Sequence, residues 1–223
     1  VGPGAGARPR DPEPVATWAS VTDSRNVAGW AQGLQAARAL HWLGQEALAA
    51  LKDDLAALAS TAGPRTLDGL AWVPREKNRA ADMLAGLAMR HRASRAWQAP
   101  PARWRALVAT GRADVLVLSD AGRRTDGAGA GLGWLVVDAA TRSELAMVGT
   151  FVPSIVNSDA DINSLEAVAA QQAHCYLSAW LSDPQYRLAL TSADPGWLSR
   201  ACRARVRRKL REDAGSRWPA DGV

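Results

Sequence analysis

Four acidic residues stand where catalytic carboxylates are commonly found, at the ends of apolar runs and near the starts of helices. Asp23 follows the apolar residues 15–21, and Asp120 comes just after the run VLVL. Asp82 lies near the start of the segment NRAADMLAGLA, and Glu166 lies one turn into NSLEAVAAQQA. Carboxylates beside apolar groups are costly to desolvate unless a positive charge compensates them. A shared divalent metal ion would supply that charge, so these residues are the candidate catalytic and metal-ligating set.

The hydrophobic pattern predicts the elements that must position these residues. Apolar runs indicate strands over residues 15–21, 67–73, 115–118, 132–137 and 144–151. Helical spacing indicates one or two helices ending near residue 58, helices over residues 78–91 and 161–181, and a basic helix whose apolar residues recur at every fourth position from 198 to 210. This mixture of strands and helices indicates an α/β chain.

Four stretches resemble the ribonuclease H family in its type 1, plant and retroelement version. SDAGRR followed by GAGAGLGWLVV resembles the first hairpin of that family, and NSLEAVAAQQA resembles its first helix. VTDSRNVAGW resembles its fourth strand, and WVPREKNRAADMLAGLAM resembles its fifth strand and last helix. Together these stretches contain every carboxylate of the family's metal site.

The two halves of the family sequence stand in reversed order here. The family carries its carboxylates in the order Asp, Glu, Asp, Asp, whereas here Asp23 and Asp82 precede Asp120 and Glu166. Circular permutation explains the reversal, since each half contains what the other lacks; the rival explanation is the tail of one domain followed by the head of another. The resemblance therefore implies a ribonuclease H-like mixed five-stranded sheet flanked by helices, circularly permuted, with the Asp120 strand parallel to and beside the Asp23 strand.

This interpretation divides the chain into five segments. They are a flexible arm over 1–14, the C-terminal half of the fold over 15–92, a linker over 93–112, the N-terminal half over 113–182 and a basic extension over 183–223. A linker of about twenty residues spans at most about 66 Å. That reach allows a closed monomer, and it equally allows a dimer in which two chains exchange halves.

The resemblance implies hydrolysis of the RNA strand of an RNA/DNA hybrid with two Mg²⁺ ions, or Mn²⁺ in their place. The ions would stabilise the attacking water and the leaving oxygen. In that scheme Asp120 bridges both ions, Glu166 and Asp23 complete one site, and Asp82 helps to bind the other.

One departure from the family favours a different class of function. Residues 75–76 are Arg-Glu, where many members carry a Gly-His pair that assists product release. The alternative to an enzyme is a catalytically inactive scaffold, or a nucleic-acid-binding component of a larger ribonucleoprotein assembly.

Positive charge is concentrated near the C-terminus. The chain has a net charge of +5, whereas residues 200–211 contain seven basic and no acidic residues. Such a helix binds a phosphate backbone through counterion release, although a solvated basic face or an acidic protein partner is the alternative. The candidate nucleic-acid-binding residues are Arg200, Arg203, Arg207, Arg208, Lys209 and Arg211.

Composition argues against several other classes. The chain has 223 residues, 48% of them hydrophobic, and it has no apolar run of about 18 residues and no charged-then-apolar leader, so we expect neither a membrane span nor a secretory signal. Two cysteines are too few for a disulfide framework or a cysteine zinc site, so a reducing compartment is the default. The expected location is intracellular, in the nucleus or an organelle. The glycines of residues 127–133 lack the spacing of a dinucleotide-binding loop and are expected to form a flexible hairpin turn.

Overall fold

The computed structural model describes most of the chain. The described residues are 16–33, 40–61, 63–64, 70–109, 113–124, 126, 128–154, 160–183, 185–186, 188 and 196–214. The arm expected over residues 1–14 lies outside them, as do residues 67–69 of the strand expected over 67–73. No helix within the described ranges combines the length and the apolar composition that a bilayer crossing requires.

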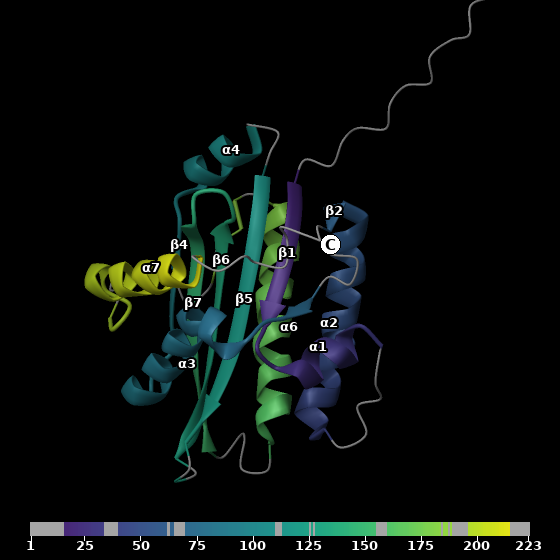
Figure 1. Ribbon diagram of the computed structural model, residues 1–223, viewed down its shortest axis with the longest axis vertical. Coiled ribbons are helices and arrows are strands. Elements are labelled where there is room, and N and C mark those ends of the chain that lie inside the picture. Colours follow the sequence, from purple (N-terminus) through teal and green to yellow (C-terminus); the bar gives the residue numbers. More distant parts are fainter. Residues whose placement is uncertain are drawn as a thin grey trace, which may run out of the picture.

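A mixed seven-stranded sheet runs through the centre of the fold (Figure 1). Its strands are β1 (Ala16–Thr22), β2 (Gly63–Pro64), β3 (Ala71–Trp72), β4 (Arg95–Gln98), β5 (Ala113–Arg123), β6 (Gly129–Asp138) and β7 (Ser143–Pro153). They lie in the order β2-β1-β5-β6-β7-β4, with β3 also beside β1. The neighbours of β1 are parallel to it, and all other pairs are antiparallel. The α/β class is confirmed, and so is the parallel pairing of the Asp23 and Asp120 strands. The sheet is larger than the five strands expected, because the short edge strands β2 and β4 extend it.

Helices cover both faces of this sheet (Figure 1). One face carries α6 (Ile162–Ser182), α2 (Trp42–Thr61) and α1 (Arg25–Ala31), and the other carries α3 (Arg79–His91) and α7 (Arg200–Ala214). A 3-10 turn, η1 (Arg75–Lys77), leads into α3, and α4 (Pro101–Ala109) follows β4. The residues expected to form one or two helices up to residue 58 form two, α1 and α2.

The burial of strand β5 on both faces explains its unbroken apolar run in the sequence. Val115 and Val117 pack into the core beneath α6, whereas Leu116 and Leu118 pack into the core beneath α3 and α7. Successive side chains of a strand point to opposite faces, and here both faces are covered. All four residues are therefore buried, and alternation with polar residues is not possible.

Residues 93–112, expected to be a linker, instead contribute two elements to the fold. β4 pairs with β7 through four residue pairs and extends the sheet at that edge. In α4, Trp104 is buried and stacks on Trp180 of α6, with the ring centroids 3.8 Å apart. The sequence conceals β4 because a short edge strand of composition RAWQ has no apolar run to mark it.

Two glycines of β6 allow α3 to lie unusually close to the sheet. A Cβ added at Gly131 would lie 2.1 Å from the carbonyl oxygen of Ala85, and one added at Gly133 would lie 2.2 Å from that of Ala81. Neither fits unless α3 moves away. The glycines from residue 129 onward, expected to form a flexible turn, are therefore a strand surface on which the Asp82 helix rests.

We expect Gly133→Ala to lower the free energy of unfolding by about 1–3 kcal/mol, because the added methyl group overpacks the contact between α3 and β6. Gly86→Ala is the control, since its added Cβ has no atom within 4 Å. As a helical glycine, Gly86 should gain about 0.5–1 kcal/mol on replacement by alanine. Urea unfolding of both variants measures this, and equal stabilities would contradict the close approach of α3.

Helix α7 docks on the sheet through an apolar stripe and one ion pair. Every fourth residue from Leu198 to Leu210 is buried in the core shared with α3, as the spacing predicted. Beside this stripe, Arg207 bonds to the carboxylate of Glu144, whose side chain is only 2% exposed. A buried carboxylate of this kind depends on its partner.

We expect Arg207→Ala to cost about 3 kcal/mol of stability, because Glu144 would remain buried with its charge uncompensated. Arg208→Ala removes an exposed pair with Glu212 from the same helix and should cost less than about 1 kcal/mol. Chemical denaturation distinguishes the two, and a small loss in both variants would show that the Arg207 pair does not stabilise the fold.

Candidate metal centre

Asp23 and Asp120 meet because β1 and β5 lie side by side in parallel. Thr22, the last residue of β1, is in register with Ser119, so the residues that follow each of them are brought together. Asp120 was expected just after the end of its strand. It lies inside the strand, because β5 continues to Arg123. Asp120 therefore lies within the sheet and is 2% exposed, whereas Asp23 is half-buried.

Glu166 reaches the same point from α6. Asp161 caps this helix, its side chain accepting from the backbone N–H of Ser164, and Glu166 follows the first turn. The hydroxyl of Thr22 donates to Oε2 of Glu166 at 3.5 Å. One carboxylate oxygen from each of Asp23, Asp120 and Glu166 lies within 4.8 Å of the others. This acidic triad could hold a metal ion.

Asn78 ties the triad to the strands, and the sequence analysis did not identify it. Its buried side chain donates from Nδ2 to Oδ1 of Asp23 at 3.0 Å and to the carbonyl oxygen of Ser119 at 2.8 Å. One amide therefore links the residue after β1 to β5. The available signal was a polar residue just before the Asp82 helix, which is ordinarily interpreted as a helix cap, but Asn78 makes no side-chain cap bond.

Burial dominates the electrostatics of the triad. Burial, followed by the charge of Glu166, raises the pKa of Asp120 above its ordinary value. Burial, followed by the charge of Asp23, raises the pKa of Glu166. Oδ2 of Asp120 is also buried and has no hydrogen-bond partner within the described ranges. A cation would compensate these groups, and an all-oxygen set of this kind suits a hard divalent ion.

Asp82, the fourth predicted ligand, lies on the same cavity but outside the triad. Its Oδ1 accepts from Nη2 of Arg75 at 2.8 Å. The 3-10 turn before α3 brings Arg75 back over the first turn of the helix, so the guanidinium stands beside Asp82 where a metal ion had been expected. Both side chains are largely exposed, at 71% for Arg75 and 46% for Asp82. Exposed pairs are weak, so this one can exchange at little cost.

A cavity of about 730 Å³ contains the site and is lined by all four carboxylates. Six basic residues also line it, namely Arg75, Arg79, Arg90, Arg123, Arg205 and Lys209. Of these six, only Lys209 was predicted from the sequence as a nucleic-acid-binding residue. The others come from four separate segments, and no local pattern in the sequence groups them.

Two predicted nucleic-acid-binding residues of α7 are used inside the protein. The guanidinium of Arg203 lies 4.6 Å from the centre of the Trp97 ring, and Arg207 bonds to Glu144. Both contacts hold α7 against the sheet, so the charge of these two residues contributes to the fold.

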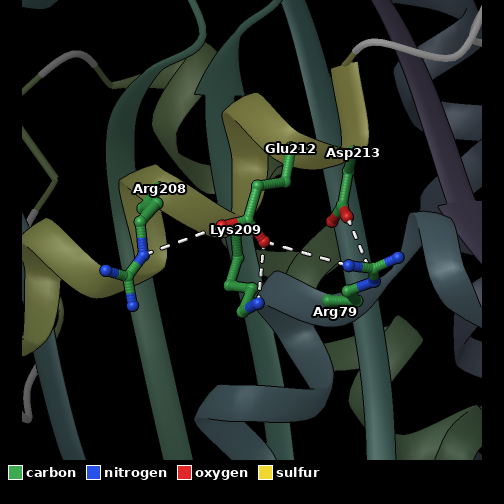
Figure 2. Close-up of polar contacts among 5 residues, drawn as sticks. All are labelled: Arg79, Arg208, Lys209, Glu212 and Asp213. Carbon is green, nitrogen blue, oxygen red and sulfur yellow. Dashed lines mark hydrogen bonds and ion pairs between the residues drawn. The ribbon is translucent and has the colours of Figure 1, made fainter.

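The other four predicted residues lie elsewhere on α7. Arg208 and Lys209 both pair with Glu212, Lys209 at 2.7 Å (Figure 2). Arg200 and Arg211 are exposed and do not line the cavity. Of the six, only Lys209 therefore stands at the carboxylate site.

Comparisons with known proteins identify no relative of this chain. No protein-family model, no curated protein and no solved structure matches it. The function is therefore inferred from the residues of the site.

Adding Mg²⁺ should raise the melting temperature, because the ion binds the folded triad and not the unfolded chain. An ion at ten times its dissociation constant stabilises the folded state by about 1.4 kcal/mol, which is about 3–6 °C for a chain of this size. Asp120→Asn should abolish the shift, whereas Asp53→Asn, an exposed carboxylate of α2, should retain it. Calorimetry with and without EDTA measures both, and a shift that survives Asp120→Asn would place the ion elsewhere.

The Mg²⁺ shift should also grow as the pH rises from about 6 to about 9. With raised pKa values, Asp120 and Glu166 retain protons that the ion must displace. The stability of the metal-free protein should change in the opposite direction. The pKa values of Asp120 and Glu166 are higher in the folded than in the unfolded state, so the free energy of unfolding falls as the pH rises. Melting curves over this pH range with and without Mg²⁺ test both trends, and a shift independent of pH would contradict proton release from the triad.

Proposed function

We propose that this chain is a metal-dependent endonuclease with a circularly permuted ribonuclease H-like fold, which hydrolyses the RNA strand of RNA/DNA hybrids. The observation that carries the proposal is the convergence of Asp23, Asp120 and Glu166 within 4.8 Å. Each of these residues belongs to a separate stretch that resembles the family. The Asp23 stretch precedes the other two in this sequence, whereas it follows them in the family.

The arrangement of the sheet supports the permuted fold. The stretch that resembles the first hairpin occupies β5 and β6, and the one that resembles the fourth strand occupies β1. β1 and β5 pair along seven residues. Two unrelated partial domains would each have an open strand edge at this point, which is unfavourable. A continuous ladder between them is what a single permuted domain requires.

The ligands of the ion would come from four segments. Asp23, Asp120 and Glu166 already share one point, and Asp82 would join them on release from Arg75. Bound Mg²⁺ would supply the positive charge that stabilises the attacking water and the leaving oxygen. The chain itself shields two of the ligands from solvent, since Asp120 and Glu166 are buried.

Two further side chains orient the ligands. Asn78 donates to Asp23 and thereby fixes one carboxylate oxygen, while Thr22 donates to Glu166. Partners of this kind hold ligands in place before the ion binds and are important to metal affinity.

An inactive scaffold is the second candidate, and the pairing of Arg75 with Asp82 favours it. A guanidinium beside one carboxylate, together with protons on Asp120 and Glu166, balances the cluster without any metal. A fold that had lost catalysis would be expected to replace metal charge with an internal cation in this way.

The test is cleavage of a labelled RNA/DNA hybrid in Mg²⁺, with RNA/RNA and DNA/DNA duplexes for comparison. We expect the RNA strand of the hybrid alone to be cut, and Asp120→Asn to slow cutting about a thousandfold, equivalent to roughly 4 kcal/mol. Asp53→Asn should cut at the wild-type rate. Cleavage at equal rates by Asp120→Asn and the wild type would refute the site, and no cleavage of any duplex by the wild type in Mg²⁺ or Mn²⁺ would favour the scaffold.

A further inference from the structure

Helix α7 carries two rows of basic residues on opposite flanks of its apolar stripe. Residues four apart lie on the same side of a helix. Arg203 and Arg207 form one row and are engaged by Trp97 and Glu144, as described above. Arg205 and Lys209 form the other row, and both line the carboxylate cavity. The helix therefore turns one basic row into the protein and the other toward the site.

We propose that α7 is a phosphate-binding wall of the active-site cavity, in which Arg205 and Lys209 contact the backbone of the nucleic acid substrate. This inference rests on the proposed function and goes beyond it, because α7 lies outside every stretch that resembles ribonuclease H. The helix would be an addition of this chain to the fold, and it specifies where the duplex passes.

The charge balance of the cavity supports a phosphate ligand. Four carboxylates and six basic side chains face the same space. Carboxylates alone would repel a phosphate, and a site that binds only a metal ion needs no basic side chains around it. Ions bound to the carboxylates would neutralise them and leave the cations to attract a polyanion.

The state of the two side chains also suits an exchangeable ligand. Arg205 is exposed and makes no ion pair with any residue that the structure describes. Lys209 pairs with Glu212 at 2.7 Å, but Glu212 is 40% exposed. A surface pair contributes little, so a phosphate can replace Glu212 at small cost.

Helix α7 also contacts α3 at the edge of the cavity. Nη1 of Arg79 lies 3.8 Å from Oε2 of Glu212, and its Nε lies 3.7 Å from Oδ1 of Asp213 (Figure 2). Arg79 extends from the first turn of α3, the helix that also carries Asp82. This bridge joins the two helices that line the cavity.

The test compares two double variants of the full chain that lose the same charge from the same helix. Arg205→Gln with Lys209→Gln removes the cavity row, and Arg200→Gln with Arg211→Gln removes two exposed residues that do not line the cavity. Binding to an RNA/DNA hybrid is measured by anisotropy over a range of salt, in an Asp120→Asn background that prevents cutting. Cleavage is measured in parallel in the otherwise unchanged chain.

We expect the cavity variant to reduce the slope of log affinity against log salt by about 1.5–2, since each lost phosphate contact removes roughly 0.9. Its affinity at 0.1 M salt should fall about tenfold to hundredfold, and its urea midpoint should match that of the parent. The control pair should alter the slope by less than half as much. Equal slope changes in the two variants, or none in the cavity variant, would overturn the inference while leaving hybrid cleavage by the wild type intact.

The remaining outcomes separate this inference from the proposed function. Binding that depends on Arg205 and Lys209 without any cleavage would support the wall and refute the nuclease. A wild-type chain that neither binds nor cuts the hybrid would refute both.

Discussion

The parallel pairing of β1 with β5 is the contact on which the rest of the site depends. Seven residue pairs align Thr22 with Ser119, and this register alone sets Asp23 beside Asp120. A shift of one residue would turn every side chain of a strand to the opposite face. A slip by one residue would move the residues of β5 that pack beneath α6 to the face beneath α3 and α7. The two cores are closely packed by different side chains, so the register is well determined.

The site that results is a compromise between burial and charge. The carboxylates are held close together where water is scarce, which raises the pKa of Asp120 and of Glu166. The protein stabilises this arrangement locally, through the amide of Asn78 and the guanidinium of Arg75. Neither contact neutralises Asp120, whose buried oxygen has no hydrogen-bond partner among the described residues. A cation that displaces the proton of Asp120 would satisfy that oxygen, which is what makes the cluster suited to a metal ion.

Helices α3 and α7, on the same face of the sheet, bring basic side chains to this cluster. α3 can approach because Gly131 and Gly133 leave room for its backbone, and α7 then packs beside it through the apolar stripe. The bridge from Arg79 to Glu212 and Asp213 joins the two helices at the edge of the cavity. Basic residues that are far apart in the sequence thereby line one space with the carboxylates, an arrangement suited to a ligand that carries many phosphates.

The sequence by itself determined the longer elements and the identity of the acidic residues. Buried strands such as β5 are marked by unbroken apolar runs, helices α3 and α6 by their period, and Asp23, Asp120 and Glu166 by their positions within the four stretches. These signals are local, so a single sequence carries them. Only the tertiary structure decided that Asp82 pairs with Arg75, that Asn78 supports Asp23, that residues 95–98 form an edge strand and that Arg205, not Arg203, faces the cavity. Each of these depends on which surfaces meet after the chain closes, and two side chains of the same kind on one helix differ only in what lies opposite them.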